Sequence, residues 1–175
     1  MSVNIVIDGY NVIRQSDRLI DLEAISLEEG RKGLIKMLAA YRKSKGHSIT
    51  VVFDGWESDN IGSSGERLQG IEVIYSGRGE KADDLIKKMA DKLRDKIVVV
   101  TSDRDIATHV MKKGAVVIPS HEFEMKLALA AVGDEEYGDY ADDEDEDSRV
   151  GGRKKGPARR RSKEEKRKKG KLDKL

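Results

Sequence analysis

The sequence predicts an α/β protein built on a mostly parallel β-sheet with helices on both faces. Short apolar runs rich in β-branched residues alternate along the chain with longer segments whose apolar residues recur at helical spacing. Several of the runs are apolar throughout, as expected for strands buried on both faces of a sheet. Strands that alternate with helices form βαβ units, and such units produce a parallel sheet.

Five strands are predicted, at residues 3–7, 49–53, 71–75, 97–101 and 115–118. Each is a short run dominated by Val, Ile and other strand-forming residues. The connection between the second and third strands is rich in Gly and Ser. We expect this connection to be a mobile loop with room for a short helix.

Helices are predicted in the other connections, because apolar residues there fall on one helix face. One stripe runs from Leu27 to Tyr41, a second from Ala82 to Leu93, and a shorter one from Ile106 to Met111. Gly114 follows the third stripe and is expected to cap that helix at its C-terminus. A last helix is expected at about residues 121–132.

Charge divides the chain into three parts. Residues 1–133 carry 20 Lys and Arg against 20 Asp and Glu, residues 134–147 carry 10 acids and no base, and residues 148–175 carry 14 bases against 3 acids. Blocks of like charge bury too little apolar surface to fold alone. We therefore predict one folded domain at 1–133, an acidic disordered linker at 134–147 and a basic disordered tail at 148–175.

The composition also bears on localisation. The chain has no cysteine, and it shows neither a signal peptide at its start nor an apolar run long enough to span a membrane. We expect a cytoplasmic protein without disulfides.

Polar residues gather at one predicted edge of the sheet. In a parallel sheet all strands end at the same edge, and ligands bind there where the strand order reverses. Most of the residues that the sequence places at this edge are carboxylates. They are Asp8, Asn11, Asp54, Asp83, Asp84, Ser102, Asp103 and Asp105.

Two interpretations of these residues stay open. Asp and Ser are favoured helix N-caps, and acids in a first helical turn complement the helix dipole. Several carboxylates at one edge also repel each other unless a cation lies between them. Mg²⁺ or Mn²⁺ takes oxygen ligands and works together with substrate phosphate. Zinc is disfavoured, because there is no cysteine and the three histidines are scattered.

Four motifs in this order resemble the YacP-like branch of the NYN domain family, which belongs to the PIN-like nuclease superfamily. The motifs are VIDGYNVI, VVFDG, GEKADDLI and VVVTSDRDI, and the match ends at about residue 131. The resemblance implies a three-layer PIN-like fold whose sheet has the strand order 3-2-1-4-5, and a metal-dependent ribonuclease activity. It marks seven acidic-site positions, namely Asp8, Asn11, Asp54, Asp83, Ser102, Asp103 and Asp105.

Two features depart from the family pattern. The motif ADDLIK has Lys87 where such proteins often have a glutamate, and the charged segments after residue 133 match no family motif. We take Asp8, Asp83 and Asp103 as the predicted metal ligands, with Asp54 and Asp105 as second choices. Asn11 and Ser102 are expected to orient a carboxylate, a water or a phosphate oxygen.

Several residues are predicted to contact RNA. The basic tail has the electrostatic character of a nucleic-acid arm, and it has no apolar face to insert into a membrane. Tyr10 and Trp56 lie near the proposed edge, where each is expected either to stack on an unpaired base or to pack in the core. The tail residues predicted to bind RNA are Arg153, Lys154, Lys155, Arg159, Arg160 and Arg161.

These observations predict a ribonuclease that uses Mg²⁺ or Mn²⁺ to hydrolyse phosphodiester bonds, with RNA and the ribosome as partners. An endoribonuclease of RNA processing or mRNA decay is the first hypothesis. A non-catalytic RNA-binding adaptor on the same fold is the alternative, and Lys87 is its best support. A phosphatase acting on small phosphate esters is a third interpretation.

Overall fold

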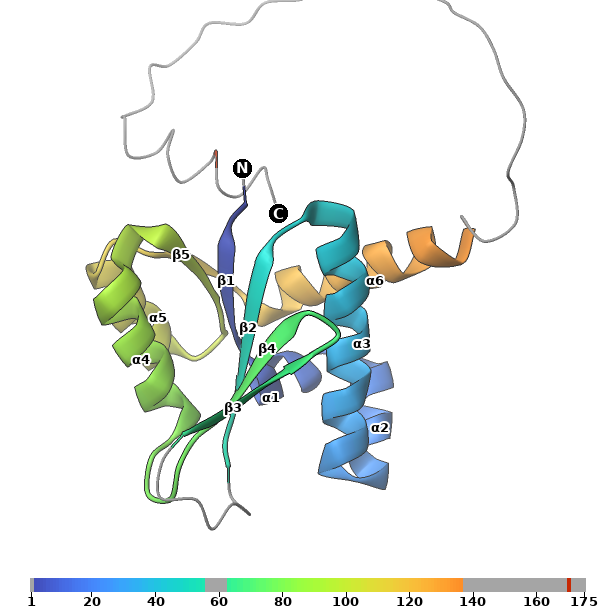
Figure 1. Cartoon of the computed structure of the whole chain (residues 1–175), viewed down its shortest axis with the longest axis horizontal. Helices are drawn as coiled ribbons and strands as arrows, with labels where there is room; N and C mark the ends of the chain where they lie inside the picture. Colours follow the sequence, from blue (N-terminus) through green and yellow to red (C-terminus); the bar gives the residue numbers. More distant parts are fainter. Residues whose placement is uncertain (1, 56–62, 137–169, 171–175) are drawn as a thin grey trace, which may run out of the picture.

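A six-stranded sheet forms the centre of the computed structural model, which describes residues 2–55, 63–136 and 170 (Figure 1). The sheet order is β3-β4-β2-β1-β5-β6, and every neighbouring pair is parallel except β3 with β4. The α/β class and the order of the five predicted strands are confirmed. The strands are β1 (Asn4–Asp8), β2 (Ser48–Phe53), β3 (Ser64–Leu68), β4 (Ile71–Tyr75), β5 (Ile97–Val100) and β6 (Val116–Ile118).

Helices cover both faces of the sheet and complete a three-layer sandwich (Figure 1). Helices α4 and α5 lie on one face, and α1, α2, α3 and α6 lie on the other. A short 3₁₀ turn, η1 (Arg94–Lys96), joins α4 to β5. The helices are α1 (Gly9–Ile13), α2 (Asp17–Ile25), α3 (Leu27–Lys45), α4 (Ala82–Leu93), α5 (Arg104–Lys112) and α6 (Ser120–Glu136).

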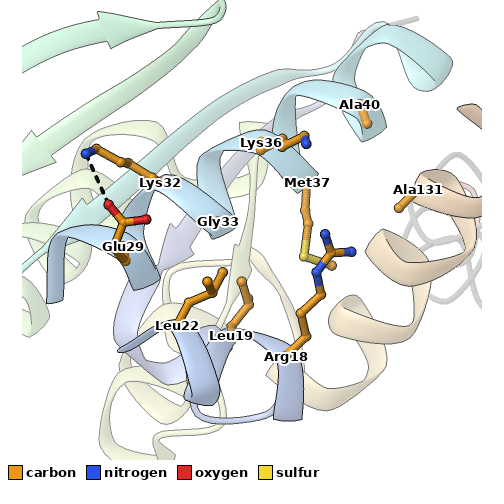
Figure 2. A pocket seen from close by; sticks show the side chains of 10 residues that line it. All are labelled: Arg18, Leu19, Leu22, Glu29, Lys32, Gly33, Lys36, Met37, Ala40 and Ala131. Atoms are coloured by element: carbon orange, nitrogen blue, oxygen red, sulfur yellow. Dashed lines mark hydrogen bonds and ion pairs between the residues drawn. The ribbon is translucent and has the colours of Figure 1, made fainter. Parts of the chain in front are cut away.

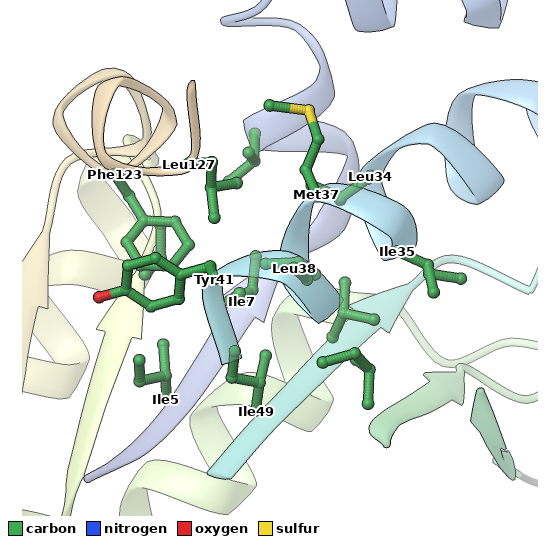
Figure 3. Packing of buried hydrophobic residues seen from close by; sticks show 14 of the residues in the cluster. Ile5, Ile7, Leu34, Ile35, Met37, Leu38, Tyr41, Ile49, Phe123 and Leu127 are labelled. Carbon is green, nitrogen blue, oxygen red and sulfur yellow. The ribbon is translucent and has the colours of Figure 1, made fainter. Parts of the chain in front are cut away.

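Alternating residues of the buried strands point into two separate apolar clusters. In β1, Ile5 and Ile7 pack under α3 and α6, whereas Val6 packs under α4 and α5. Figure 3 shows the larger cluster, in which Tyr41 of α3 meets Phe123 of α6 with ring centroids 5.3 Å apart. Burial on both faces explains why these strands are apolar at successive positions.

The connection expected to be a loop contains an additional strand. Residues 64–68, SGERL, form β3, which pairs antiparallel with β4 at the sheet edge. The turn between them has φ of 52° at Gln69 and 82° at Gly70, the left-handed values that suit a two-residue hairpin. Because the side chains of β3 are largely exposed, the strand carries no apolar pattern that the sequence could reveal.

The helices also differ in detail from the prediction. Helices α1 and α2 were not predicted, and α6 extends beyond the expected end of the domain to Glu136. Leu27 and Met111, expected on buried faces, are 42% and 56% exposed. Gly114 follows the end of α5 with φ of 85°, which confirms its predicted place at the helix C-terminus.

No helix in the described ranges is long and apolar enough to cross a membrane. Apart from residues 134–136, which continue α6, and Gly170, the predicted acidic linker and basic tail lie outside the described residues.

Candidate functional site

Strands β1, β2 and β5 end side by side at the centre of the sheet. Ile7 of β1 is in register with Val51 of β2 and with Val100 of β5. The polar residues that follow these strands therefore share one edge, and α4 begins beside them because its first amide is bound to the residue after β2. The predicted clustering of Asp8, Asp54, Asp83 and Asp103 follows from this topology.

Asp8 is held by two hydrogen bonds at the end of β1. It caps α1, with Oδ1 accepting a hydrogen bond from the Asn11 amide at 3.4 Å, while Oδ2 accepts one from Thr101 Oγ1 at 3.2 Å. Burial, together with the negative charges of Asp83 and Asp54, raises the pKa of the Asp8 carboxyl to about 6, although the two hydrogen bonds act to lower it. The carboxylate is thus fixed in position, and no cationic side chain among the described residues forms an ion pair with it.

The carboxyl of Asp83, like that of Asp8, has a raised pKa. It lies in the first turn of α4, and burial together with the charges of Asp103 and Asp54 raises the pKa of its carboxyl. No described residue donates a hydrogen bond to it. Asp8 and Asp83 therefore belong to one set of mutually repelling carboxylates, which we call the carboxylate edge: Asp8, Asp54, Asp83 and Asp103.

Asp54 fixes the start of α4 against the end of β2. Its Oδ1 accepts a hydrogen bond from the Ala82 amide at 2.7 Å, although 28 residues separate the two in sequence. A carboxylate at this point satisfies one of the amides that a helix leaves unpaired at its N-terminus. This contact places Asp83, the next residue of α4, beside the carboxylate edge.

Asp103 is an N-cap, as the simpler interpretation held. Its Oδ1 accepts hydrogen bonds from the amides of Asp105 at 2.8 Å and Ile106 at 3.1 Å at the start of α5. Capping occupies one carboxylate oxygen, and no described residue hydrogen-bonds to the other. A role in capping and a role at the carboxylate edge are therefore compatible.

The two roles of Asp103 can be separated by stability measurements without metal. Asp103→Asn keeps a capping oxygen and removes a charge, so we expect its free energy of unfolding in urea to be unchanged or slightly higher. Asp103→Ala removes the cap and should lose about 1 kcal/mol. An equal loss in both variants would show that the charge itself stabilises the fold, and would contradict the repulsion described above.

Asn11 connects the loops that follow β5 and β6. Its Oδ1 accepts hydrogen bonds from the Ser102 amide at 2.9 Å and from Ser120 Oγ at 2.6 Å. The Ser120 amide in turn donates to Ser102 Oγ at 3.0 Å. The Asn11 side-chain NH₂ donates to no described residue, so it remains able to bind a water or a phosphate oxygen.

Thr101 and Ser120 take part in the site although the sequence analysis did not select them. Thr101 is 1% exposed, and its Oγ1 donates to Asp8 and accepts from the Asp103 amide at 3.1 Å. Ser120 is fully buried beside Asn11. Single hydroxyl residues have no spacing pattern, and the only available signal for Thr101 was its position at the end of an apolar strand.

Asp105 points away from the carboxylate edge. Its side chain is 82% exposed and forms an ion pair with Lys87 of α4, and Lys87 lowers the pKa of the Asp105 carboxyl. Lys87, which replaces the glutamate expected from the family pattern, offsets through its positive charge a part of the rise in the Asp83 pKa. Asp105 is therefore a weaker candidate ligand than the four carboxylates of the edge.

The predicted metal ligands have the oxygen chemistry that suits a divalent cation, but they do not form a complete binding site. Within residues 2–55 and 63–136, no three His, Asp or Glu side chains lie close enough together to hold one ion. Asp8, Asp83 and Asp103 are thus not assembled as three direct ligands. All donors at this edge are oxygens, and Mg²⁺ commonly takes one or two carboxylates and keeps several waters.

Of the residues predicted to contact RNA outside the carboxylate edge, the structure describes Tyr10 alone. Tyr10 is 9% exposed and packs on Phe53 with ring centroids 5.1 Å apart, so it belongs to the core and cannot stack on a base. The remaining predicted contacts lie outside the described residues: Trp56, Arg153, Lys154, Lys155, Arg159, Arg160 and Arg161.

A separate cavity of about 440 Å³ lies between α2, α3 and α6 (Figure 2). Its apolar floor includes Leu19 and Met37, and its rim carries basic side chains such as Arg18 and Lys36. None of the predicted site residues lines this cavity, so it is distinct from the carboxylate edge.

Comparison with known proteins gives the family. A sequence model of the YacP-like NYN domain matches residues 5–173. This chain belongs to the YacP-like NYN domain family. The match continues far beyond residue 131, where the resemblance was expected to end, so the charged C-terminal segment lies within the span of the family model. The family has the PIN-like nuclease type of fold, which agrees with the sheet order described above.

Members of this family from Bacillus subtilis show the similarity directly. The protein YacP of strain 168 is 34% identical over 114 residues, which cover 63% of this chain and 66% of that protein, just under two thirds. The crystal structure of Rae1 (YacP) matches with a TM-score of 0.65 and 30% identity over 78% of this chain and 79% of that one. A mutant of the same protein gives a TM-score of 0.63 at 30% identity, covering 77% and 80%.

Proposed function

We propose that this protein is a divalent-metal-dependent ribonuclease that hydrolyses phosphodiester bonds of RNA, with an endonucleolytic role in RNA processing or mRNA decay. The main support is the carboxylate edge, where burial and the charges of neighbouring carboxylates raise the carboxyl pKa values of both Asp8 and Asp83. Such repulsion is a cost that a folded protein retains when a cation is to be bound there. The nuclease-type fold of the family supports the same activity.

The side chains of the edge have separate tasks in this proposal. Asp8 is kept in place by Thr101 and by the cap of α1, and it is ionised above a pH of about 6. The NH₂ of Asn11, which donates to no described residue, is suited to donate to a phosphate oxygen or a water. Bound Mg²⁺ or Mn²⁺ would activate a water and offset negative charge developing at phosphorus. The described carboxylates would orient that water by accepting its protons in hydrogen bonds.

A cleavage assay tests the proposal. Purified protein should cut single-stranded RNA in the presence of Mn²⁺ and stop when EDTA is added. Binding of RNA without any cleavage would instead favour the adaptor, for which Lys87 in place of the glutamate of the family pattern is the best support. Turnover of p-nitrophenyl phosphate without RNA cleavage would favour the phosphatase.

The basic segment at 148–175 is proposed to bind RNA or the ribosome, and truncation after Glu136 tests this. The shortened protein should still fold, because every buried apolar residue of the described core lies between Val3 and Leu127. It should cleave a short saturating oligonucleotide at a similar maximal rate, whereas its affinity for long RNA should fall. Losing about five phosphate contacts should reduce the slope of log affinity against log salt by about 3.5.

Binding of one long RNA at several salt concentrations, measured for the full chain and the truncated protein, distinguishes the outcomes. Equal slopes would show that the basic segment does not contact RNA, and a protein partner or a membrane surface would then become the better explanation.

A further inference from the structure

Arg31 of α3 lies against three aromatic side chains. Its guanidinium carbon is 5.6 Å from the ring centroid of Tyr10, 5.7 Å from that of Phe53 and 5.4 Å from that of Tyr75. The rings also pack on each other, since Phe53 contacts Tyr10 edge-on and stacks on Tyr75 with their planes 25° apart. Cation–π contacts of this kind fix the orientation of a guanidinium group that solvent would otherwise leave free.

The three rings place Arg31 on the α3 side of the sheet, near the ends of β1, β2 and β4. Tyr10 lies two residues after Asp8, Phe53 directly precedes Asp54, and Tyr75 is the last residue of β4. Helix α3 runs antiparallel to these strands, so its N-terminal turns lie over the ends of the strands. Arg31 is therefore a partly exposed cation on the α3 side of the sheet, near the strand ends that carry Asp8 and Asp54.

Most of the hydrogen-bonding capacity of Arg31 is unused. Its Nε donates to Tyr10 Oη at 2.8 Å, and no other described residue accepts a hydrogen bond from the guanidinium. The nearby acids of α3 have their own partner, because Glu28 and Glu29 contact Lys32 Nζ at 2.8 and 3.3 Å. A guanidinium has five N–H donors, so its two terminal nitrogens remain available.

We propose that Arg31 forms a phosphate-binding subsite for the RNA strand next to the bond that is cleaved. The inference rests on the proposed function and extends it by assigning a residue that positions the substrate. The aromatic rings hold the guanidinium, and its terminal nitrogens bind two oxygens of one phosphate as a fork. Arg31 thereby brings a phosphate to an edge whose carboxylates would otherwise repel it.

Binding of a short single-stranded oligouridine RNA in EDTA tests this subsite without cleavage. Arg31→Met in the full chain should weaken binding about 10-fold, because a charge-assisted hydrogen-bond pair is lost. It should also reduce the slope of log affinity against log salt by about 0.7, the value for one neutralised phosphate on a single strand. Lys43→Met is the matched control, since Lys43 is exposed on the same helix about 18 Å away along its axis.

A lysine variant covers the case in which Arg31→Met does not fold. Arg31→Lys keeps the charge and should keep the salt slope, but it should bind more weakly because an ammonium group cannot form the fork. If Arg31→Met and Arg31→Lys both fold and bind RNA with the affinity and salt slope of the wild type, the proposal is overturned. If Arg31→Met does not fold, wild-type affinity in Arg31→Lys alone overturns it. An equal effect of Lys43→Met would also overturn it, because general charge would then explain the binding.

The same set of proteins separates this inference from the proposed function. Assays with Mn²⁺ should show cleavage by the wild type and a higher KM for Arg31→Met. Absence of cleavage by the wild type would contradict the proposed function while leaving the binding result intact. Unchanged RNA binding by Arg31→Met, together with normal wild-type cleavage, would contradict the subsite alone.

Discussion

Asp8→Asn is expected to lower the rate of RNA cleavage by more than about 100-fold while the protein remains folded. Asparagine retains an oxygen that can cap α1, but it removes the charge from the residue fixed between Asn11 and Thr101. The variant should also lose the stabilisation by Mn²⁺, which for the wild type should reach about 2.7 kcal/mol at 100 times the dissociation constant. Asp21→Asn, an exposed change on α2, is the control and should retain both properties.

Asp8→Asn is also expected to differ from the wild type in how its free energy of unfolding depends on pH. The pKa of the Asp8 carboxyl is raised from 3.8 to about 6 in the folded protein, so the native state binds more protons than the unfolded state between these values. Without metal, the wild type should therefore lose stability as pH rises from about 4 to 6, by on the order of 3 kcal/mol. Asp8→Asn should lack this loss and be the more stable protein at neutral pH. The two unfolding free energies should converge below about pH 4.

Gly9→Ala, which adds a single methyl group beside the site, is expected to lower the free energy of unfolding strongly. A Cβ at this position would lie 2.2, 2.5 and 2.8 Å from three ring atoms of Phe53. Phe53 is fully buried and is packed between Tyr10 and Tyr75, so its ring has no space to move away. We expect a loss of about 2–3 kcal/mol in the free energy of unfolding, the usual cost of overpacking.

Urea unfolding measures this effect, and two further variants define its cause. Gly65→Ala is the control, because its nearest neighbour, the Val73 carbonyl oxygen, would be at an ordinary distance of 3.8 Å. Phe53→Leu should cost less in the Gly9→Ala protein than in the wild type, since the two positions are in contact. Wild-type stability of Gly9→Ala would contradict the close packing that sets the direction of the chain after Asp8.

The sequence revealed those parts of the fold whose side chains repeat with a period. The five buried strands and the apolar faces of α3 and α4 could be found in this way, because burial requires apolar residues at fixed intervals. Strand β3 could not, since SGERL is held by backbone pairing and exposes its side chains. Helix α1 in GYNVI was not predicted, because five residues directly after a strand are too few to show a helical period.

The candidate site could be predicted only as a set of residues at one edge. Position along the chain indicated that Asp8, Asp54, Asp83 and Asp103 would follow strands that end at one edge, where several of these charges act on one another, although no three of them lie close enough to hold one ion directly. It could not reveal that Asp54 binds the Ala82 amide, or that Asp105 turns outward to Lys87. Such contacts join segments far apart in sequence, and they depend on how α4 and α5 pack on the sheet. Arg31 was missed for the same reason, because nothing in α3 indicates which rings lie beneath it.

Cleavage of single-stranded RNA by the wild type and by Asp8→Asn, purified identically and assayed with Mn²⁺ and then with EDTA, tests the central claim most directly. We predict products from the wild type that depend on Mn²⁺ and cease with EDTA, and none from Asp8→Asn. Using the inactive variant excludes a contaminating nuclease as the source of the products. Equal cleavage by both proteins, or cleavage that persists in EDTA, would contradict a metal-dependent nuclease centred on the carboxylate edge.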